Sequence, residues 1–232
     1  MRGLSHRAFP EQQHLWTIAI AVIAIVSLAV GNLAALVQRD VKRLLAYSSV
    51  SHAGFMLIAV AANSELGARA LLYYLIPYGA MSIGAFAVVA ARERELGAPV
   101  TLDNLGGMGW ERPFLGAAMW VFMLGAMGMP LTGGLLGKFY VFSAAYEAGL
   151  WWLIVAGVIA TAISLYYYLG VIRALYMRPA VELRPAVAGG SPPRDPLLQS
   201  AVFLSLVVTV GSFFFVQPLI DLARDAAASL PF

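Results

Sequence analysis

One lysine stands alone in a long uncharged segment, where it could transfer a proton. Lys138 follows 25 residues without a charged side chain, and the segment from Pro113 to Tyr146 holds no other charge. A lysine inside a bilayer is costly, so it normally faces the interior of a helix bundle and a partner. A lysine that gains and loses a carboxylate partner can load and release a proton. The alternative is a lysine that snorkels to the interface or pins helices together.

Proline and glycine interrupt this segment. At about 1.5 Å per residue, a continuous helix from 113 to 146 would be about 50 Å long, whereas the hydrocarbon core is about 30 Å thick. We therefore expect a helix that is discontinuous around 125–137. Transporters use such breaks to place freed backbone groups beside an ion path. The expected hinge and supporting polar residues are Pro130, Gly133, Gly134, Gly137 and Tyr140.

A second polar cluster follows Asp40. At about 100° per residue, Lys42, Ser49 and His52 fall within about 80° on one helix face. Histidine changes its charge near neutral pH, which suits proton transfer. His52 lies about 15 Å along the axis from Lys42, so a hydroxyl and water between them would complete a relay. The alternative is that the hydroxyls only bridge helices and that Lys42 is a cytoplasmic anchor.

The composition is that of a membrane protein. The 232 residues are 61% hydrophobic and only 12% charged, with a mean hydropathy of +0.80, whereas soluble domains are about 25% charged. This excludes an ordinary cytosolic domain and a nucleic-acid binder, although the isoelectric point is 9.3. The chain has no cysteine and only three scattered histidines. We therefore expect no metal site and no redox cofactor in this chain.

The uncharged stretches predict an all-α fold, a polytopic transmembrane helix bundle with six spans. A span needs about 20 apolar residues. A repeat of five helices is expected at 15–178, with the fourth helix broken, and a final transmembrane helix at 196–220. The expected flanking parts are an N-terminal flank at 1–14, a cytoplasmic loop at 179–195 and a C-terminal tail at 221–232.

The positive charges favour one broken span over two full spans. With six crossings, ten arginines and lysines lie on one side and four on the other; with two full spans, this bias is lost. The side richer in positive charge is cytoplasmic. Both termini of this chain are then expected on the non-cytoplasmic side. The start does not read as a cleavable signal peptide, because Pro10 and Glu11 precede an apolar run that is too long.

Two blocks resemble a known family. The block from Gly31 to Gly54, with its Asp40, Lys42 and His52, is similar to the antiporter-like subunits of respiratory complex I and of multisubunit cation/proton antiporters. The block from Gly134 to Phe142 places Lys138 in a Gly-Lys-Phe-Tyr setting. That setting resembles subunit N of bacterial NADH:quinone oxidoreductase, whereas the M subunit has glutamate there.

The resemblance implies a proton-translocating membrane subunit of an enzyme, driven by quinone reduction elsewhere in the assembly. Lys138 would end the half-channel towards the outside, and His52 and Lys42 would belong to the central polar axis. NADH, FMN, iron–sulfur clusters and quinone would bind partner subunits. The partners would be other membrane-arm subunits, including a neighbouring antiporter-like subunit, in the bacterial inner membrane. The alternatives are a cation/proton antiporter subunit and a non-conducting structural subunit.

The chain departs from this family in its length. The family has about fourteen helices with two inverted repeats of five, and the six spans expected here match the second repeat and the last helix. The first repeat and the connecting helix have no counterpart. We therefore expect a fragment, a split gene or a misassigned start, and at most the outer half of a proton path.

Overall fold

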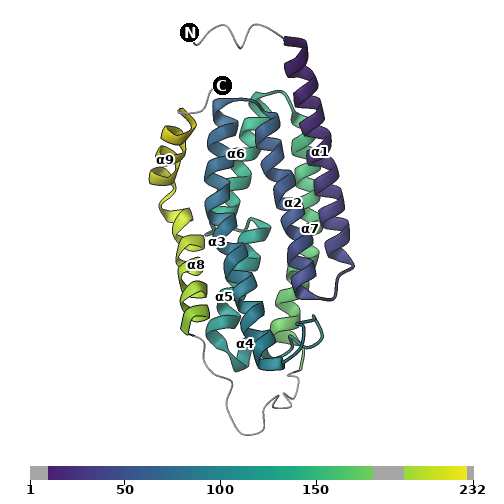
Figure 1. Cartoon of the computed structure of the whole chain (residues 1–232), viewed down its shortest axis with the longest axis vertical. Helices are drawn as coiled ribbons and strands as arrows, with labels where there is room; N and C mark the ends of the chain where they lie inside the picture. The colour runs from purple at the N-terminus through teal and green to yellow at the C-terminus, as the bar shows by residue number, and fades with distance from the viewer. Residues whose placement is uncertain (1–9, 180–195, 229–232) are drawn as a thin grey trace.

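Helices make up almost the whole structure. The computed structural model describes residues 10–179 and 196–228, and within them it has nine helices and no β-strand (Figure 1). The all-α class is therefore confirmed. The helices are α1 Pro10–Leu36, α2 Val41–Ala61, α3 Glu65–Leu96, α4 Met108–Glu111, α5 Pro113–Met127, α6 Gly133–Glu147, α7 Trp151–Met177, α8 Pro196–Phe214 and α9 Val216–Ala228.

Five helices are long and apolar enough to cross a membrane. They are α1 from Leu15, α2, α3, α7 and α8. Four of them lie within the expected repeat at 15–178, and α8 lies within the expected final helix at 196–220. The long helices lie side by side and form an elongated bundle, and α5 and α6 follow one another along its length (Figure 1). Of the expected loop at 179–195, only residue 179 is described, and residues 1–9 of the expected flank and 229–232 of the expected tail also lie outside the described residues.

Local caps fix the ends of the helices that carry the polar residues. The side chain of Asp40 accepts a hydrogen bond from the backbone N–H of Arg43 (2.9 Å) and starts α2. Ser64 does the same for Gly67 (3.0 Å) at the start of α3. Such caps satisfy amide groups that have no partner in the first helical turn. Gly97 ends α3 in the left-handed conformation (φ 65°).

Helices α1 and α2 approach closely because glycine lies at their contacts. A Cβ on Gly31 would be 2.5 Å from the backbone nitrogen of Ser51, and a Cβ on Gly54 would be 3.0 Å from the carbonyl oxygen of Ala24. Small residues allow membrane helices to pack backbone to backbone. Beside this contact the Asn32 amide donates to the Ser51 hydroxyl (2.7 Å). The first motif block therefore forms a tight antiparallel helix pair.

The chain between α5 and α6 is not helical at 128–132. Gly128 has φ 84°, and the N–H groups of Gly128 and Met129 return to the carbonyls of Gly125 (3.0 Å) and Leu124 (3.0 Å), the pattern of a Schellman helix end. Pro130 cannot continue the helix, because it has no N–H group. Residues 128–132 thus separate α5 from α6, and they fall within the range 125–137; that the two helices form one broken span stays a prediction.

Helix α6 then packs back on α5 through Gly134. A Cβ at Gly134 would lie only 1.9 Å from the carbonyl oxygen of Gly125. No real side chain fits at that distance, so the two short helices can meet here because position 134 is glycine. This contact fixes where the first turns of α6 lie relative to the end of α5.

The last expected helix is shorter than the range 196–220. The structure ends α8 at Phe214 and begins a separate helix, α9, at Val216. Pro218 explains the change, because it lacks an N–H group for the carbonyl of Phe214 and its ring would clash with that carbonyl. Proline is tolerated in the first turn of α9, where no such bond is needed. Helix α9 also extends into the expected tail.

A buried ionic cluster closes the end of the bundle where α3 ends. Arg92 is fully buried and pairs with Glu95 (3.3 Å) and with Glu111 of α4 (3.1 Å). Arg112 pairs with Glu95 (2.9 Å) just before α5 begins. Buried charges require such partners. The cluster therefore holds the start of α5 against the end of α3.

Substitution of Gly134 by alanine should separate α5 from α6. The new methyl group would meet backbone, which cannot rotate away, and overpacking of this kind costs about 1–3 kcal/mol. We expect G134A to lower the melting temperature of the purified assembly by about 5 °C or more. The measurement is thermal unfolding of the detergent-purified assembly that contains the chain.

Gly79 is the matched control, because it lies inside α3 and a Cβ there would meet nothing within 4 Å. G79A should leave the melting temperature unchanged or raise it slightly, as alanine favours the helix. Equal melting temperatures for G134A and G79A would contradict the close contact between α5 and α6.

Candidate functional site

Lys138 is buried beside the end of α5. It lies in the second turn of α6, and its amine returns across the break, where it donates to the carbonyl oxygens of Ala126 (3.2 Å) and Met127 (2.9 Å). The last carbonyls of a helix have no partner within it, and the helix dipole favours a positive charge there. The carbonyl end of α5 therefore binds the lysine amine.

The other neighbours of the amine are a hydroxyl group on one side and an aromatic ring on the other. The amine is 3.4 Å from the hydroxyl of Thr161 in α7 and 4.9 Å from the centre of the Phe55 ring in α2. A charged amine has three hydrogen atoms to donate, and two carbonyls and one hydroxyl receive them. The ring face adds a cation–π attraction. Within residues 10–179 and 196–228, no carboxylate pairs with Lys138.

His52 is buried between two tyrosines from different helices. Its Nδ1 is 2.7 Å from the hydroxyl of Tyr74 in α3, and its Nε2 is 3.0 Å from the hydroxyl of Tyr168 in α7. The Tyr168 hydroxyl also hydrogen-bonds with Ser48, one turn before His52. Both ring nitrogens are thus occupied. Whichever nitrogen carries the proton, the other one accepts.

Gly137 connects the histidine cluster with the lysine. A Cβ on Gly137 would lie 2.2 Å from the ring of Tyr74, so only glycine lets that ring lie against α6 one residue before Lys138. A cavity of about 20 Å³ borders His52, Tyr168 and Ala126, whose carbonyl receives the lysine. Its lining is mostly apolar, with Ser48, His52 and Tyr168 among its polar members, and its volume is close to that of one water molecule.

Further buried polar groups extend the cluster along α2 and α7. The Tyr167 hydroxyl donates to the side-chain oxygen of Asn32 (3.2 Å), and the rings of Tyr167 and Tyr168 are 4.5 Å apart. Asn32 in turn holds Ser51. These groups are neutral, and all of them are buried. They form a continuous polar band from α1 through α7 to α3.

The structure does not bring Lys42 or Ser49 to this cluster. Lys42 lies at the exposed start of α2 and pairs with Glu93 of α3. Ten residues of helix, about 15 Å, separate it from His52. The Ser49 hydroxyl donates to the carbonyl of Leu45 in its own helix (3.0 Å). The neighbouring Ser48 holds the position that Ser49 was expected to occupy.

The expected hinge residues all lie at the break or next to it. Pro130 is exposed in the interruption, and a Cβ on Gly133 would lie 2.1 Å from the hydroxyl oxygen of Ser212 in α8. Tyr140 packs edge-on against Tyr73, with 5.6 Å between the ring centres. Tyr73 donates to the carbonyl of Ser212 (2.8 Å). These contacts fasten the break to α3 and α8.

Residue spacing did not identify Tyr74, Thr161 or Ser48 as members of the site. In the sequence Tyr74 is close to the start of the uncharged stretch that follows Arg69, a place typical of an interfacial aromatic residue. Its buried hydroxyl becomes visible only when α3, α2 and α6 are placed together. The triple tyrosine at 166–168 carried a partial signal, because two of its hydroxyls point inwards while Tyr166 remains 74% exposed.

The chemistry available to this arrangement is proton transfer. An amine, an imidazole and several hydroxyls lie within one buried region, and each can donate and accept a proton. Among the described residues, no group of three or more histidine, cysteine or acidic side chains could hold a metal ion. A buried lysine without a carboxylate partner is the most unusual member of the region.

Comparison with known proteins gives a consistent result. A relative from Salinibacter ruber, NADH-quinone oxidoreductase subunit N, is 44% identical over 85% of this chain and 38% of its own length. A solved structure of respiratory complex I from Thermus thermophilus with bound aureothin contains a chain that is 35% identical, with a TM-score of 0.73, over 88% of this chain and 44% of that one. The chain thus spans about four tenths of the length of the curated relatives it matches.

The Mrp complex from Dietzia sp. contains a chain with the same fold. The TM-score is 0.80 at 21% identity, over 93% of this chain and 47% of that one. The family described as NADH:quinone oxidoreductase/Mrp antiporter, transmembrane, matches residues 3–164, which include α1 to α6 and both motif blocks. The chain belongs to the NADH:quinone oxidoreductase/Mrp antiporter transmembrane family.

Proposed function

We propose that the chain is part of a proton-translocating membrane subunit of NADH:quinone oxidoreductase, and that Lys138 carries the proton. The observation that supports this proposal most is the environment of the Lys138 amine. Its amine is buried and has two carbonyls, a hydroxyl and a ring as neighbours, with no carboxylate among the described residues to hold the charge in place. A lysine held in this way can change its protonation state without breaking an ion pair.

The proposal includes a sixth membrane crossing formed by α5 and α6 together. Each has 15 residues, about 22 Å of helix, too short for a core of about 30 Å. Along the chain, α5 begins beside α4 at the arginine-rich end of the bundle, and α6 ends at the opposite end (Figure 1). Under this arrangement the ends carrying Arg39, Arg112 and Arg178 are cytoplasmic, and both termini of this chain lie on the other side of the bacterial inner membrane.

Within this path, His52 passes protons between hydroxyl groups. It can receive a proton on one ring nitrogen while it releases another from the second nitrogen, towards Tyr74 or Tyr168. The packing of Tyr74 on Gly137 and the water-sized cavity beside Ala126 support transfer between this relay and Lys138. Lys42 remains a sequence-based prediction, and its ion pair with Glu93 is compatible with a purely structural role.

The source of energy is proposed to lie in partner subunits. NADH, FMN, iron–sulfur clusters and quinone would bind there, and electrons would not pass through this chain. Other membrane-arm subunits, including a neighbouring antiporter-like subunit, would cover its exposed helical faces. The higher identity to relatives named subunit N than to the Mrp chain supports this over a cation/proton antiporter without NADH.

A non-conducting structural subunit is the second candidate. The two bonds from Lys138 to the carbonyls of α5 favour it, because they also close the helix end. The two functions differ in what loss of the amine does to an assembled complex. A structural lysine affects assembly and stability, whereas a proton carrier affects proton movement for each electron transferred.

Replacement of Lys138 by methionine tests the proposal directly. Methionine keeps the length and removes the proton, so we expect proton uptake by inverted membrane vesicles to fall roughly tenfold or more, either alone or together with NADH–quinone electron transfer. Both rates are measured on the same vesicles. The amount of assembled complex is measured beside them.

Two variants complete this experiment. K138R keeps a permanent charge that does not release its proton, so it should assemble and remain inactive. S143A removes a hydroxyl from a half-buried position of α6 that bonds only within its own helix, so it should behave as wild type. If K138M assembles and pumps as wild type does, the lysine is structural and the proposal fails.

The tyrosine–histidine relay makes a second prediction. Y168F removes the hydroxyl that meets both His52 and Ser48 while the ring stays in place. It leaves a buried ring nitrogen without its partner. We expect proton uptake per electron to fall several-fold in a normally assembled complex.

The matched control for Y168F is the same change at the adjacent Tyr166. It is 74% exposed, and Y166F removes the same hydroxyl outside the polar band. Proton uptake in Y166F should equal wild type. Equal rates in Y168F and Y166F would remove Tyr168 from the proposed path.

A further inference from the structure

A groove of about 700 Å³ opens between α1 and α7, away from the Lys138 site. Its walls are apolar over most of their length and include Leu36, Leu44, Leu169 and Ile172. Leu169 is about half exposed, so the groove is open to its surroundings. The size is that of a small-molecule site.

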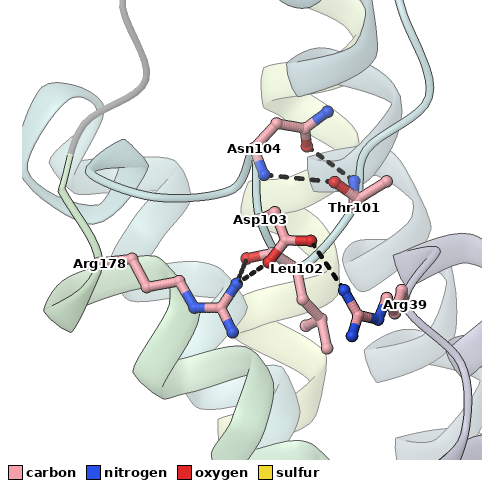
Figure 2. A network of polar contacts seen from close by, with 6 residues as sticks. All are labelled: Arg39, Thr101, Leu102, Asp103, Asn104 and Arg178. Carbon is pink, nitrogen blue, oxygen red and sulfur yellow. Dashed lines mark hydrogen bonds and ion pairs between the residues drawn. The ribbon is translucent and has the colours of Figure 1, made fainter.

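Arginines gather at one end of this groove. Arg39, Arg173 and Arg178 line it, together with a single carboxylate, Asp103. Asp103 lies between Arg39 and Arg178 (Figure 2). Arg39 reaches it from the connection between α1 and α2, and Arg178 reaches it from the end of α7. Two of these three cations pair with the one carboxylate, so that end of the groove keeps a net positive charge and attracts negative charge.

The loop that carries Asp103 is held in place by its own contacts. Arg178 donates to the carbonyl of Leu102 (2.9 Å), and Thr101 and Asn104 exchange hydrogen bonds between backbone N–H groups and side chains (Figure 2). The N–H of Leu102 also donates to the carbonyl of Arg39 (2.8 Å). The arginines are therefore arranged before any ligand arrives.

Arg173 is the cation that remains available. It is exposed on α7 and lines the groove. No ion pair joins it to a carboxylate of residues 10–179 or 196–228. Its planar group presents five N–H donors, a geometry that matches the oxygens of a phosphate.

The depth of the groove indicates what its ligand must be. Its lining on α7 extends from Arg178 to Tyr166, twelve residues or about 18 Å along the helix axis. Half of a hydrocarbon core is about 15 Å. A ligand that matches the groove therefore has an anionic group at the arginine end and an apolar chain that reaches towards the middle of the bilayer.

We propose that this groove binds an anionic phospholipid, with the phosphate at Arg173 and Arg39 and an acyl chain along α7. A free phosphate ion would leave the apolar length of the groove unused. A zwitterionic lipid would gain less from three arginines, since its own cation opposes them. The inference does not depend on proton transfer through Lys138.

The test uses the complete complex in vesicles of phosphatidylcholine with a trace of photoactivatable lipid. One sample receives phosphatidylglycerol and the other phosphatidylcholine, each with a diazirine on an acyl chain. After illumination, labelled peptides are mapped by mass spectrometry. We expect phosphatidylglycerol to label residues 166–177 about fivefold more than phosphatidylcholine.

Arginine variants test the site itself. R173Q should reduce labelling by phosphatidylglycerol about fivefold and leave labelling by phosphatidylcholine unchanged. R39Q provides a second variant at an exposed position. R43Q is the matched control, because Arg43 is exposed at the same end of the bundle and does not line the groove.

Each possible result decides the proposal. Equal labelling by the two lipids, or equal effects of R173Q and R43Q, would show that the groove does not select an anionic headgroup. No labelling of 166–177 by either lipid would mean that protein fills the groove in the complex. Either result overturns the inference, whatever the K138M experiment shows.

Discussion

The break between α5 and α6 leaves backbone carbonyls without helical partners inside an apolar bundle, where water is not freely available to bind them. The amine of Lys138 supplies hydrogen bonds to these carbonyls. It needs them in turn, because an amine is also costly to bury. Each satisfies the other, through bonds of 3.2 and 2.9 Å. The break and the lysine are thus one feature, and the glycine contacts around them serve to bring the two parts together.

This exchange explains why so many small residues surround the site. Gly134 lets α6 approach the backbone of α5, Gly137 admits the ring of Tyr74, and Gly133 admits Ser212 of α8. A Cβ at any of them would move α6 and, with it, the amine. The geometry of Lys138 therefore depends on close contacts in three directions, one with backbone and two with side chains, rather than on one strong interaction. A change at a distant contact of α6 is expected to reach the lysine.

The sequence was most informative at residues whose type restricts or frees the backbone itself, such as proline and glycine. Pro130 and its glycines indicate an interruption, and the structure ends α5 at Met127. Side-chain partners were harder to predict. A helical period gives the face of a residue only to about 100°, so Ser49 was expected where Ser48 lies. The partners of Lys138 were missed because backbone carbonyls carry no side-chain signal. Pro218 did carry the signal that separates α8 from α9, since proline disrupts the helix before it.

The molecule also separates two kinds of polar interaction. At the arginine-rich end, Arg92, Arg112 and Asp103 form ion pairs. Around His52 the contacts join neutral hydroxyls, an imidazole and amides. Ion pairs fix charges in place and resist proton transfer, whereas neutral groups can pass a proton and return to their starting state. With Lys138 as the charged side chain among these neutral groups, a change in its protonation alters the field at every hydroxyl of the band.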